Sequence, residues 1–246
     1  MGEYPEIKLI AIDMDGTLLD ANHQVPEENR LAIREAEEKG IKVVLSTGRA
    51  IRTVKDYAVS LELSSYLVTV NGSEIWGPDG ELVERNPVST PLIKWMWDMS
   101  KHHKTHFWAI SSTGNWHNEM PEDFEKHVWL KFGFDVEDDK VRKLILKDLE
   151  ARKEFELSNS SLKNIEVNAQ GINKAKGLKN VCDLLGISMN NVLAIGDSLN
   201  DVAMIKEAGI GVAMGNAQDA VKKAANWVTA TNLESGVAKA IRKWAI

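Results

Sequence analysis

Residues 7–17 read IKLIAIDMDGT, an apolar run followed at once by two acids, a glycine and a threonine. The apolar run predicts a short buried strand, because strands inside a parallel sheet are apolar on both faces. The period of two in a strand directs Asp13 and Asp15 to the same side. Two neighbouring carboxylates raise each other's pKa unless a cation lies between them. The stretch therefore predicts a metal site or an acid pair, with a simple turn at Gly16 as the alternative.

Composition excludes several classes of protein. The 246 residues suffice for one large domain or two smaller ones, and the hydrophobic fraction of 43% is that of an ordinary globular protein. The net charge is -6 and there is no basic block, which disfavours binding to nucleic acid or to anionic membranes. With Cys182 as the single cysteine and no signal-type or membrane-length apolar run, we expect a cytoplasmic protein. Its oligomeric state stays open.

Short strands and helices alternate in the first third of the chain and again in the last third. Apolar, β-branched runs predict strands at 7–12, 41–46, 66–70, 192–195, 210–213 and 227–229. Between them, helical signals cover 26–39, 51–61, 176–185, 201–208, 217–225 and 233–244. Such alternation predicts an α/β fold with a Rossmann-like, doubly wound parallel sheet.

The middle of the chain has a different pattern. Residues 82–168 hold five of the eight tryptophans, and their strands are more polar. We predict that this segment is an inserted second domain, and that 1–81 and 169–246 together form the core domain. Histidines 102, 103 and 106 raise the possibility of a zinc site, but no matching Cys or acid set accompanies them, which favours a solvated helix end. Residues 116–118 (WHN) are candidates for a loop that faces a substrate.

Chemically suggestive residues follow four of the predicted strands. They are DMD at 13–15, STGR at 46–49, NG at 71–72 and GDSLND at 196–201. In doubly wound sheets, ligands bind beyond the carboxyl ends of the strands, so these residues should share one rim. Asp13, Asp197 and Asp201 are hard oxygen donors of the kind that Mg²⁺ prefers. A calcium EF-hand is disfavoured because the loop after Asp15 lacks acids at the later ligand positions. Neither an EF-hand nor a response-regulator receiver explains the second acidic cluster, at Asp197.

Four motifs in this order resemble those of a known family. They are DMDGT at 13–17, TGR at 47–49, a lysine in GINKAKG at 171–177 and GDSLND at 196–201, followed by GVAMGNA at 211–217. By these motifs the chain resembles the Cof-type phosphatases of the haloacid dehalogenase (HAD) superfamily, and the resemblance covers nearly the whole chain. The resemblance implies a core with an inserted α/β cap of the C2B type. Ala175 stands where glycine is usual, so both Lys174 and Lys176 are candidates for the motif lysine. Lys174 is favoured because it occupies the motif position.

The resemblance also implies roles for individual residues. Asp13 would attack phosphorus and bind Mg²⁺, and Asp15 would act as acid and base while its carbonyl binds the metal. Asp197 would bind the metal, and Asp201 would do so directly or through water. A phosphate-binding set would consist of Thr47, Gly48, Asn71, Lys174 and Asn200, with Thr47 and Lys174 also catalytic. Whether Arg49 binds a ligand or pairs with a nearby acid is open.

We therefore expect a Mg²⁺-dependent phosphatase that hydrolyses small phosphomonoesters, such as sugar phosphates or related metabolites, through an aspartyl-phosphate. One alternative is a phosphomutase of the phosphomannomutase type, which a bisphosphate activator would reveal. A second is a catalytically silent, phosphate-binding regulatory protein. The sequence does not name the substrate, because the inserted domain would select it.

Overall fold

The computed structural model describes residues 5–246, which divide into two compact units. Unit 1 consists of the described residues up to Glu84 together with Lys174–Ile246, and unit 2 is Arg85–Asn173. Both boundaries of unit 2 lie a few residues further toward the C-terminus than those of the expected insertion, 82–168. Within the described part of the chain, no helix is both long enough and apolar enough to cross a membrane.

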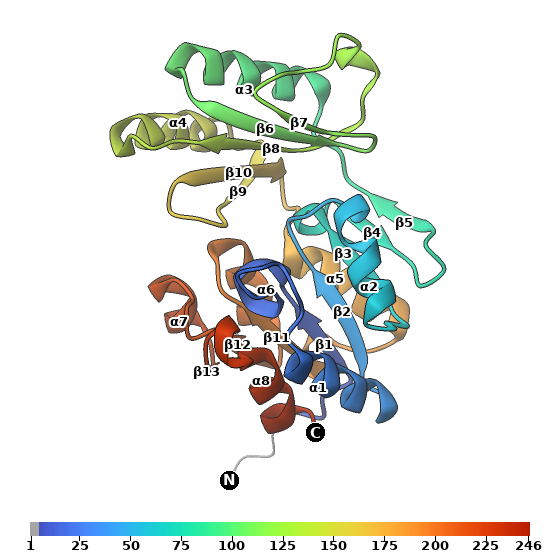
Figure 1. Ribbon diagram of the computed structural model, residues 1–246. Coiled ribbons are helices and arrows are strands. Elements are labelled where there is room, and N and C mark those ends of the chain that lie inside the picture. The colour runs from blue at the N-terminus through green and yellow to red at the C-terminus, as the bar shows by residue number, and fades with distance from the viewer. Residues whose placement is uncertain (1–4) are drawn as a thin grey trace. The chain divides into compact units, whose positions relative to one another are not determined.

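Unit 1 contains an eight-stranded sheet in the order β13-β12-β11-β1-β2-β3-β4-β5 (Figure 1). The strands are β1 (Leu9–Ile12), β2 (Lys42–Ser46), β3 (Leu67–Thr69), β4 (Glu74–Trp76), β5 (Leu82–Arg85), β11 (Val192–Gly196), β12 (Ile210–Ala213) and β13 (Trp227–Val228). From β13 to β3 all neighbours are parallel, whereas β4 runs antiparallel to β3. The predicted parallel sheet is confirmed. The sequence-based prediction missed β4 and β5, which have only three and four residues.

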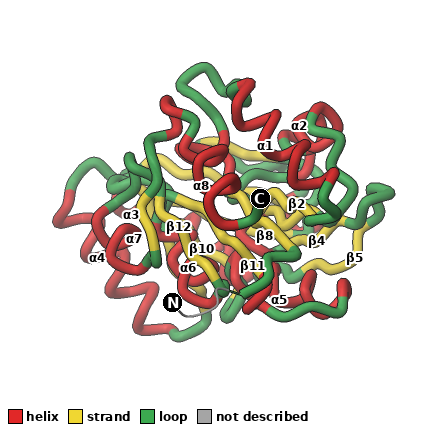
Figure 2. Tube along the Cα trace, turned by 90° about the horizontal axis from the view of Figure 1, so that it is seen from below, coloured by secondary structure: helices red, strands yellow, loops and turns green. Residues whose placement is uncertain are grey.

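Helices cover both faces of this sheet. They are α1 (Glu27–Glu38), α2 (Lys55–Ser60), α5 (Lys174–Leu185), α6 (Val202–Glu207), α7 (Asp219–Ala224) and α8 (Gly236–Trp244). Along β1, Ile10 and Ile12 join the hydrophobic cluster that contains α1 and α8, whereas Leu9 and Ala11 join the one that contains α5. Figure 2 shows α1 and α8 on one side of the strands and α5 on the other. The strand is apolar throughout because both of its faces are buried.

Unit 2 is a five-stranded antiparallel sheet in the order β7-β6-β8-β10-β9, with two helices. Its elements are α3 (Thr90–His103), β6 (His106–Ser111), β7 (Asn115–His117), β8 (Trp129–Asp135), α4 (Asp139–Arg152), β9 (Phe155–Ser158) and β10 (Asn164–Ala169). Alternate strand residues such as Phe107 and Phe132 form one hydrophobic cluster with Ile93 of α3 and Ile145 of α4. Both helices therefore pack on the same face of the sheet.

The candidate substrate-facing residues of unit 2 lie on and just after its edge strand β7. The Trp116 ring packs against the His127 ring, with centroids 5.2 Å apart. Asn118 Oδ1 accepts a hydrogen bond of 2.9 Å from the Phe107 backbone N–H. Two of the three side chains are thus engaged within unit 2, and both His117 and Asn118 are exposed.

Candidate active site

The loop after β1 brings Asp13 to the rim of the sheet but gives Asp15 another direction. The strand ends at Ile12, and residues 14–18 form a tight turn broken at Asp15 (ψ 122°) and Gly16 (φ 77°). The expectation that strand periodicity directs both acids to one side is therefore wrong, because the acids lie beyond the strand. A Cβ at position 16 would lie 2.6 Å from Asp197 Oδ2, and any other residue would have to adopt the positive φ found there. Only glycine therefore fits at this position.

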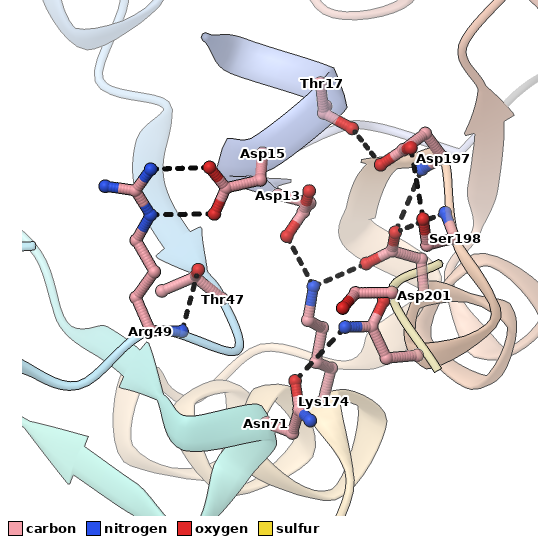
Figure 3. A network of polar contacts seen from close by, with 12 residues as sticks. Asp13, Asp15, Thr17, Thr47, Arg49, Asn71, Lys174, Asp197, Ser198 and Asp201 are labelled. Carbon is pink, nitrogen blue, oxygen red and sulfur yellow. Dashed lines mark hydrogen bonds and ion pairs between the residues drawn. The ribbon is translucent and has the colours of Figure 1, made fainter. Parts of the chain in front are cut away.

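Lys174 begins α5 and its side chain has no exposed surface. Its Nζ donates hydrogen bonds to Asp13 Oδ1 at 2.5 Å and to Asp201 Oδ1 at 2.6 Å (Figure 3). Burial by itself lowers the pKa of the Lys174 ammonium, but the two carboxylates outweigh it and raise that pKa above its ordinary value. The ammonium is therefore charged. Lys176, the other lysine in question, is exposed.

Asp13 is buried, and its environment works against its charge. Burial raises the pKa of Asp13 well above its ordinary value, Lys174 opposes this rise, and the charges of Asp201 and Asp197 add to it. Its backbone N–H donates to the Ile195 carbonyl at 3.0 Å, which ties the residue to the neighbouring strand β11. A carboxylate held in this way needs positive charge beside it, and Lys174 supplies one such charge.

Asp197 follows β11 and is held by two hydroxyl groups. Thr17 Oγ1 donates to its Oδ1 and Ser198 Oγ donates to its Oδ2, each at 3.1 Å. Burial, with the nearby Asp201, raises the pKa of Asp197 to about 6. No role was expected for Thr17 or Ser198, although both lie inside the DMDGT and GDSLND motifs. The available signal was their position in the chain: Ser198 is adjacent to Asp197, and Thr17 lies four residues after Asp13.

Asp201 has both carboxylate oxygens engaged by the protein. Its Oδ1 accepts from Lys174, and its Oδ2 accepts from the backbone N–H groups of Asp197 at 2.9 Å and Ser198 at 3.0 Å. The side chain is fully buried. These bonds orient the lysine and the loop that carries Asp197.

The three acids fit a divalent cation. Asp13, Asp197 and Asp201 each offer one carboxylate oxygen, and these oxygens lie within 4.8 Å of one another. Together with the Lys174 ammonium, the three carboxylates leave an excess of two negative charges at a largely buried position. Such an excess is costly unless a cation compensates it. Carboxylate oxygens at this spacing form the donor set that Mg²⁺ prefers.

Asp15 lies outside this cluster and pairs with Arg49. Its carboxylate accepts from Arg49 Nε at 2.7 Å and from Nη2 at 2.5 Å, so the two planar groups meet through two parallel bonds (Figure 3). The question left open for Arg49 is thereby answered: it pairs with an acid, and that acid is the candidate proton donor.

The remaining predicted residues gather at the ends of β2 and β3. Thr47 is buried and its Oγ1 accepts from the Arg49 N–H at 3.2 Å, and its carbonyl accepts from the Asn71 N–H at 2.9 Å. Gly48 lies half-buried in the same turn. Asn200 Nδ2 donates to Asn71 Oδ1 at 3.3 Å. The turn predicted at residues 71–72 thus contacts two other motifs.

Backbone strain marks the loop after β3. Val70 (φ 50°) and Asn71 (φ 57°) both adopt left-handed conformations, which is unfavourable above all for a β-branched residue. Strain of this kind concentrates at functional sites.

Asn216, for which no role was expected, stabilises the loop after β1: its Nδ2 donates to the Gly16 carbonyl at 2.8 Å. The signal was its place in the GVAMGNA stretch.

Comparison with known proteins agrees with this geometry. The family model for haloacid dehalogenase-like hydrolases matches residues 10–241. The chain is 58% identical over 244 residues to 5-amino-6-(5-phospho-D-ribitylamino)uracil phosphatase YcsE of Bacillus subtilis (strain 168), covering 99% of this chain and 98% of the relative. It is 31% identical over 279 residues to phosphatase YwpJ of the same organism, covering 94% and 98%.

Solved structures show the same fold. A haloacid dehalogenase-like hydrolase from B. subtilis superposes with a TM-score of 0.89 at 26% identity, covering 96% of this chain and 99% of that one. A HAD subclass IIB sugar phosphatase, 23% identical, has a TM-score of 0.82 and covers 96% and 98%, which shows the fold alone. The chain belongs to the haloacid dehalogenase-like hydrolases and is a phosphatase.

Proposed function

We propose that this phosphatase hydrolyses small phosphomonoesters with Mg²⁺ and passes through an aspartyl-phosphate on Asp13. The observation that carries the proposal is the buried contact between Asp13 and Lys174 inside a cluster of three acids at the strand ends. A nucleophile, a fixed cation and a place for a divalent cation thus occur together. Positioning and charge stabilisation supply most of the catalysis of phosphoryl transfer.

In the first step an Asp13 carboxylate oxygen attacks phosphorus, and the bond between phosphorus and the ester oxygen breaks. Asp15 gives its proton to the departing oxygen, which leaves as an alcohol. Lys174 keeps the attacking carboxylate in place and offsets the charge that develops on the phosphoryl oxygens. Thr47 already accepts one hydrogen bond through Oγ1, and we assign its hydroxyl proton to a phosphoryl oxygen.

In the second step Asp15 takes a proton from water, and that water attacks the aspartyl-phosphate. Inorganic phosphate leaves and the Asp13 carboxylate is restored, with Asp15 protonated for the next turnover. A bound Mg²⁺ would supply the positive charge that lets an anionic phosphoryl group approach an anionic carboxylate.

Asp13, Asp197 and the Asp15 carbonyl are the groups that we assign to hold this Mg²⁺. Both oxygens of Asp201 are engaged by Lys174 and by two backbone N–H groups. Its part is therefore to orient the lysine and the Asp197 loop, with any contact to the metal made through water.

For the substrate, we propose a phosphate ester at the end of a polyhydroxy chain. The relative that is 58% identical carries the name 5-amino-6-(5-phospho-D-ribitylamino)uracil phosphatase, so this compound is the first substrate to test. The groups assigned so far bind a phosphate and offer little to recognise the rest of a molecule. We therefore assign selection of the leaving group to unit 2, as a cap, with His117 and Asn118 as the exposed members of the candidate loop.

The decisive experiment replaces the nucleophile. Asp13→Asn is nearly isosteric, but an amide does not attack phosphorus, so phosphatase activity should fall below about 1% of the wild-type rate. The fold should survive, which thermal melting checks. Lys174 keeps its bond to Asp201 in this variant. Mass spectrometry should show that the new amide has not deamidated back to aspartate, and activity above a few per cent in such protein would exclude Asp13 as the nucleophile.

A further inference from the structure

The candidate acid Asp15 has a side chain that is 48% exposed, yet Arg49 holds it through two hydrogen bonds. The Arg49 guanidinium contributes Nε and Nη2 to its two carboxylate oxygens. A bidentate pair of this type restricts both the position and the plane of a carboxylate, which a single hydrogen bond does not. An exposed aspartate without such a partner would sample several rotamers.

Arg49 is itself held by two other segments. Its Nη2 lies 3.3 Å from His23 Nδ1, and its guanidinium lies over the Tyr57 ring, 5.6 Å from the ring centre. Tyr57 Oη in turn donates to the His23 carbonyl at 2.9 Å. The Arg49 side chain is only 21% exposed. Residues from α2 and from the loop around His23 thus both contact the Arg49 guanidinium.

We propose that Arg49 is a positioning residue, which acts on phosphoryl transfer only through the orientation of Asp15, and that His23 and Tyr57 hold it in place. The inference rests on the proposed function, because it assumes that Asp15 protonates the leaving group. It goes beyond that function by making the discrimination between good and poor leaving groups depend on a residue that does not touch the reacting atoms.

The leaving group separates this role from a merely structural one. An alkyl phosphate, such as a sugar phosphate, needs a proton on its departing oxygen, whereas p-nitrophenyl phosphate releases p-nitrophenolate readily without one. The value of kcat/KM reports the first phosphoryl transfer alone. For Arg49→Ala we expect a loss in kcat/KM of about 10- to 100-fold on alkyl esters, the scale of a misplaced catalytic group. On p-nitrophenyl phosphate the loss should stay within about threefold.

The second step gives a further signature. With Asp15 poorly oriented, water attacks the aspartyl-phosphate slowly, so kcat and KM for p-nitrophenyl phosphate should fall together. Acid-quenched Arg49→Ala protein should then carry more covalent phosphate than wild type. Arg49→Lys, which keeps the charge and loses the fork, should give an intermediate loss. Tyr57→Phe keeps the ring beneath Arg49 but removes the hydroxyl, which bonds to the His23 carbonyl and also interacts with the Arg49 guanidinium, and it should cost less than either.

A double-mutant cycle with Asp15→Asn is the sharpest test. If Arg49 acts only through Asp15, adding Arg49→Ala to Asp15→Asn should change kcat/KM on alkyl esters by less than about twofold. Multiplying losses would overturn the inference, and so would an equal loss on alkyl and aryl esters, which would place Arg49 on the phosphoryl group itself. Full activity of Arg49→Ala on both esters would overturn it as well.

Failure of the proposed function looks different. It would appear in the wild-type protein, as no turnover of either ester, or in Asp15→Asn, as a loss that does not depend on the leaving group. Either result removes the basis of the inference too. Melting curves of each variant, compared with wild type, show that the measured losses come from folded protein.

Discussion

At the scale of single residues, Lys174 shows how the surroundings decide what a side chain does. A lysine at the first position of a helix is usually solvated, and only its place in the GINKAKG motif indicated another role for Lys174. In the structure its ammonium is fully buried between two carboxylates. Buried charges persist only when they are paired and hydrogen-bonded, so each of the three groups depends on the other two.

Replacing this lysine should therefore damage stability as well as activity. Lys174→Met leaves Asp13 and Asp201 facing each other without a cation, which should lower the free energy of unfolding by about 3–5 kcal/mol in metal-free buffer. Adding Asp201→Asn removes one of the two charges and should recover part of that loss. Urea unfolding at neutral pH measures both effects.

The matched control lies two residues further along the same helix. Lys176 is exposed, so Lys176→Met should change the free energy of unfolding by no more than about 0.5 kcal/mol. If the two methionine variants unfold at the same urea concentration, the buried charge cluster is not a source of stability.

At the scale of elements, helix α5 carries Lys174 and must approach the sheet closely to deliver it. Gly177 makes this approach possible: a Cβ there would lie 2.6 Å from Val68 Cγ1 of β3 and 3.2 Å from the Gly72 Cα. The same glycine thus packs beside the strained loop that holds Asn71. The spacing of lysine and glycine in GINKAKG couples the position of the catalytic lysine to β3.

Gly177→Ala tests this coupling. Alanine favours a helix, yet here the added methyl group should push α5 away from β3 and cost about 1–3 kcal/mol of stability. The displacement moves Lys174, so kcat should fall about tenfold or more. Val68→Ala removes the atom that clashes, and the double variant should regain part of the activity. A Gly177→Ala protein that is as stable and as active as wild type would show that the helix has room to move.

At the scale of the whole molecule, the acid cluster links stability to pH and to metal. Burial raises the pKa of Asp197 to about 6, above its ordinary value of 3.8. Between about pH 4 and pH 6, the native protein therefore keeps a proton on Asp197 that the unfolded chain has already lost. Without metal, the contribution of this group to stability is lost between about pH 4 and pH 6, and the charged form is a burden above it.

Mg²⁺ should reverse this loss, because it binds the native state through the ionised carboxylates. Saturating Mg²⁺ should raise the melting temperature by about 5 °C or more at about pH 7.5, and by much less at about pH 5. EDTA should abolish activity, and added Mg²⁺ should restore it. Asp197→Asn should remove most of the Mg²⁺-dependent shift in melting. A shift of equal size at both pH values would contradict the assigned ligands.

The sequence predicted the strands of the parallel sheet and the residues at their ends with little ambiguity. Apolar runs such as 192–195 form strands that are buried on both faces of a parallel sheet. Parallel strands end on the same rim, so the acids that follow them converge. Strand β4 escaped prediction because its three residues, Glu74–Trp76, closely follow the turn predicted at 71–72 and begin with an acid, so no apolar run marks them. The roles of the site residues, the bounds of the cap and the cytoplasmic location stay predictions.

By itself, then, the sequence determined the sheet core of the fold, the family and the set of polar residues at the rim. Only the tertiary structure decided how those residues are paired. Asp15 turns to Arg49, 34 positions away in the chain, and Lys174 joins Asp13 across 161 positions. Local periodicity cannot specify such contacts, because they depend on how loops from separate strands come together. Burial, which makes Lys174 a charged partner rather than a solvated side chain, arises only once those loops are packed.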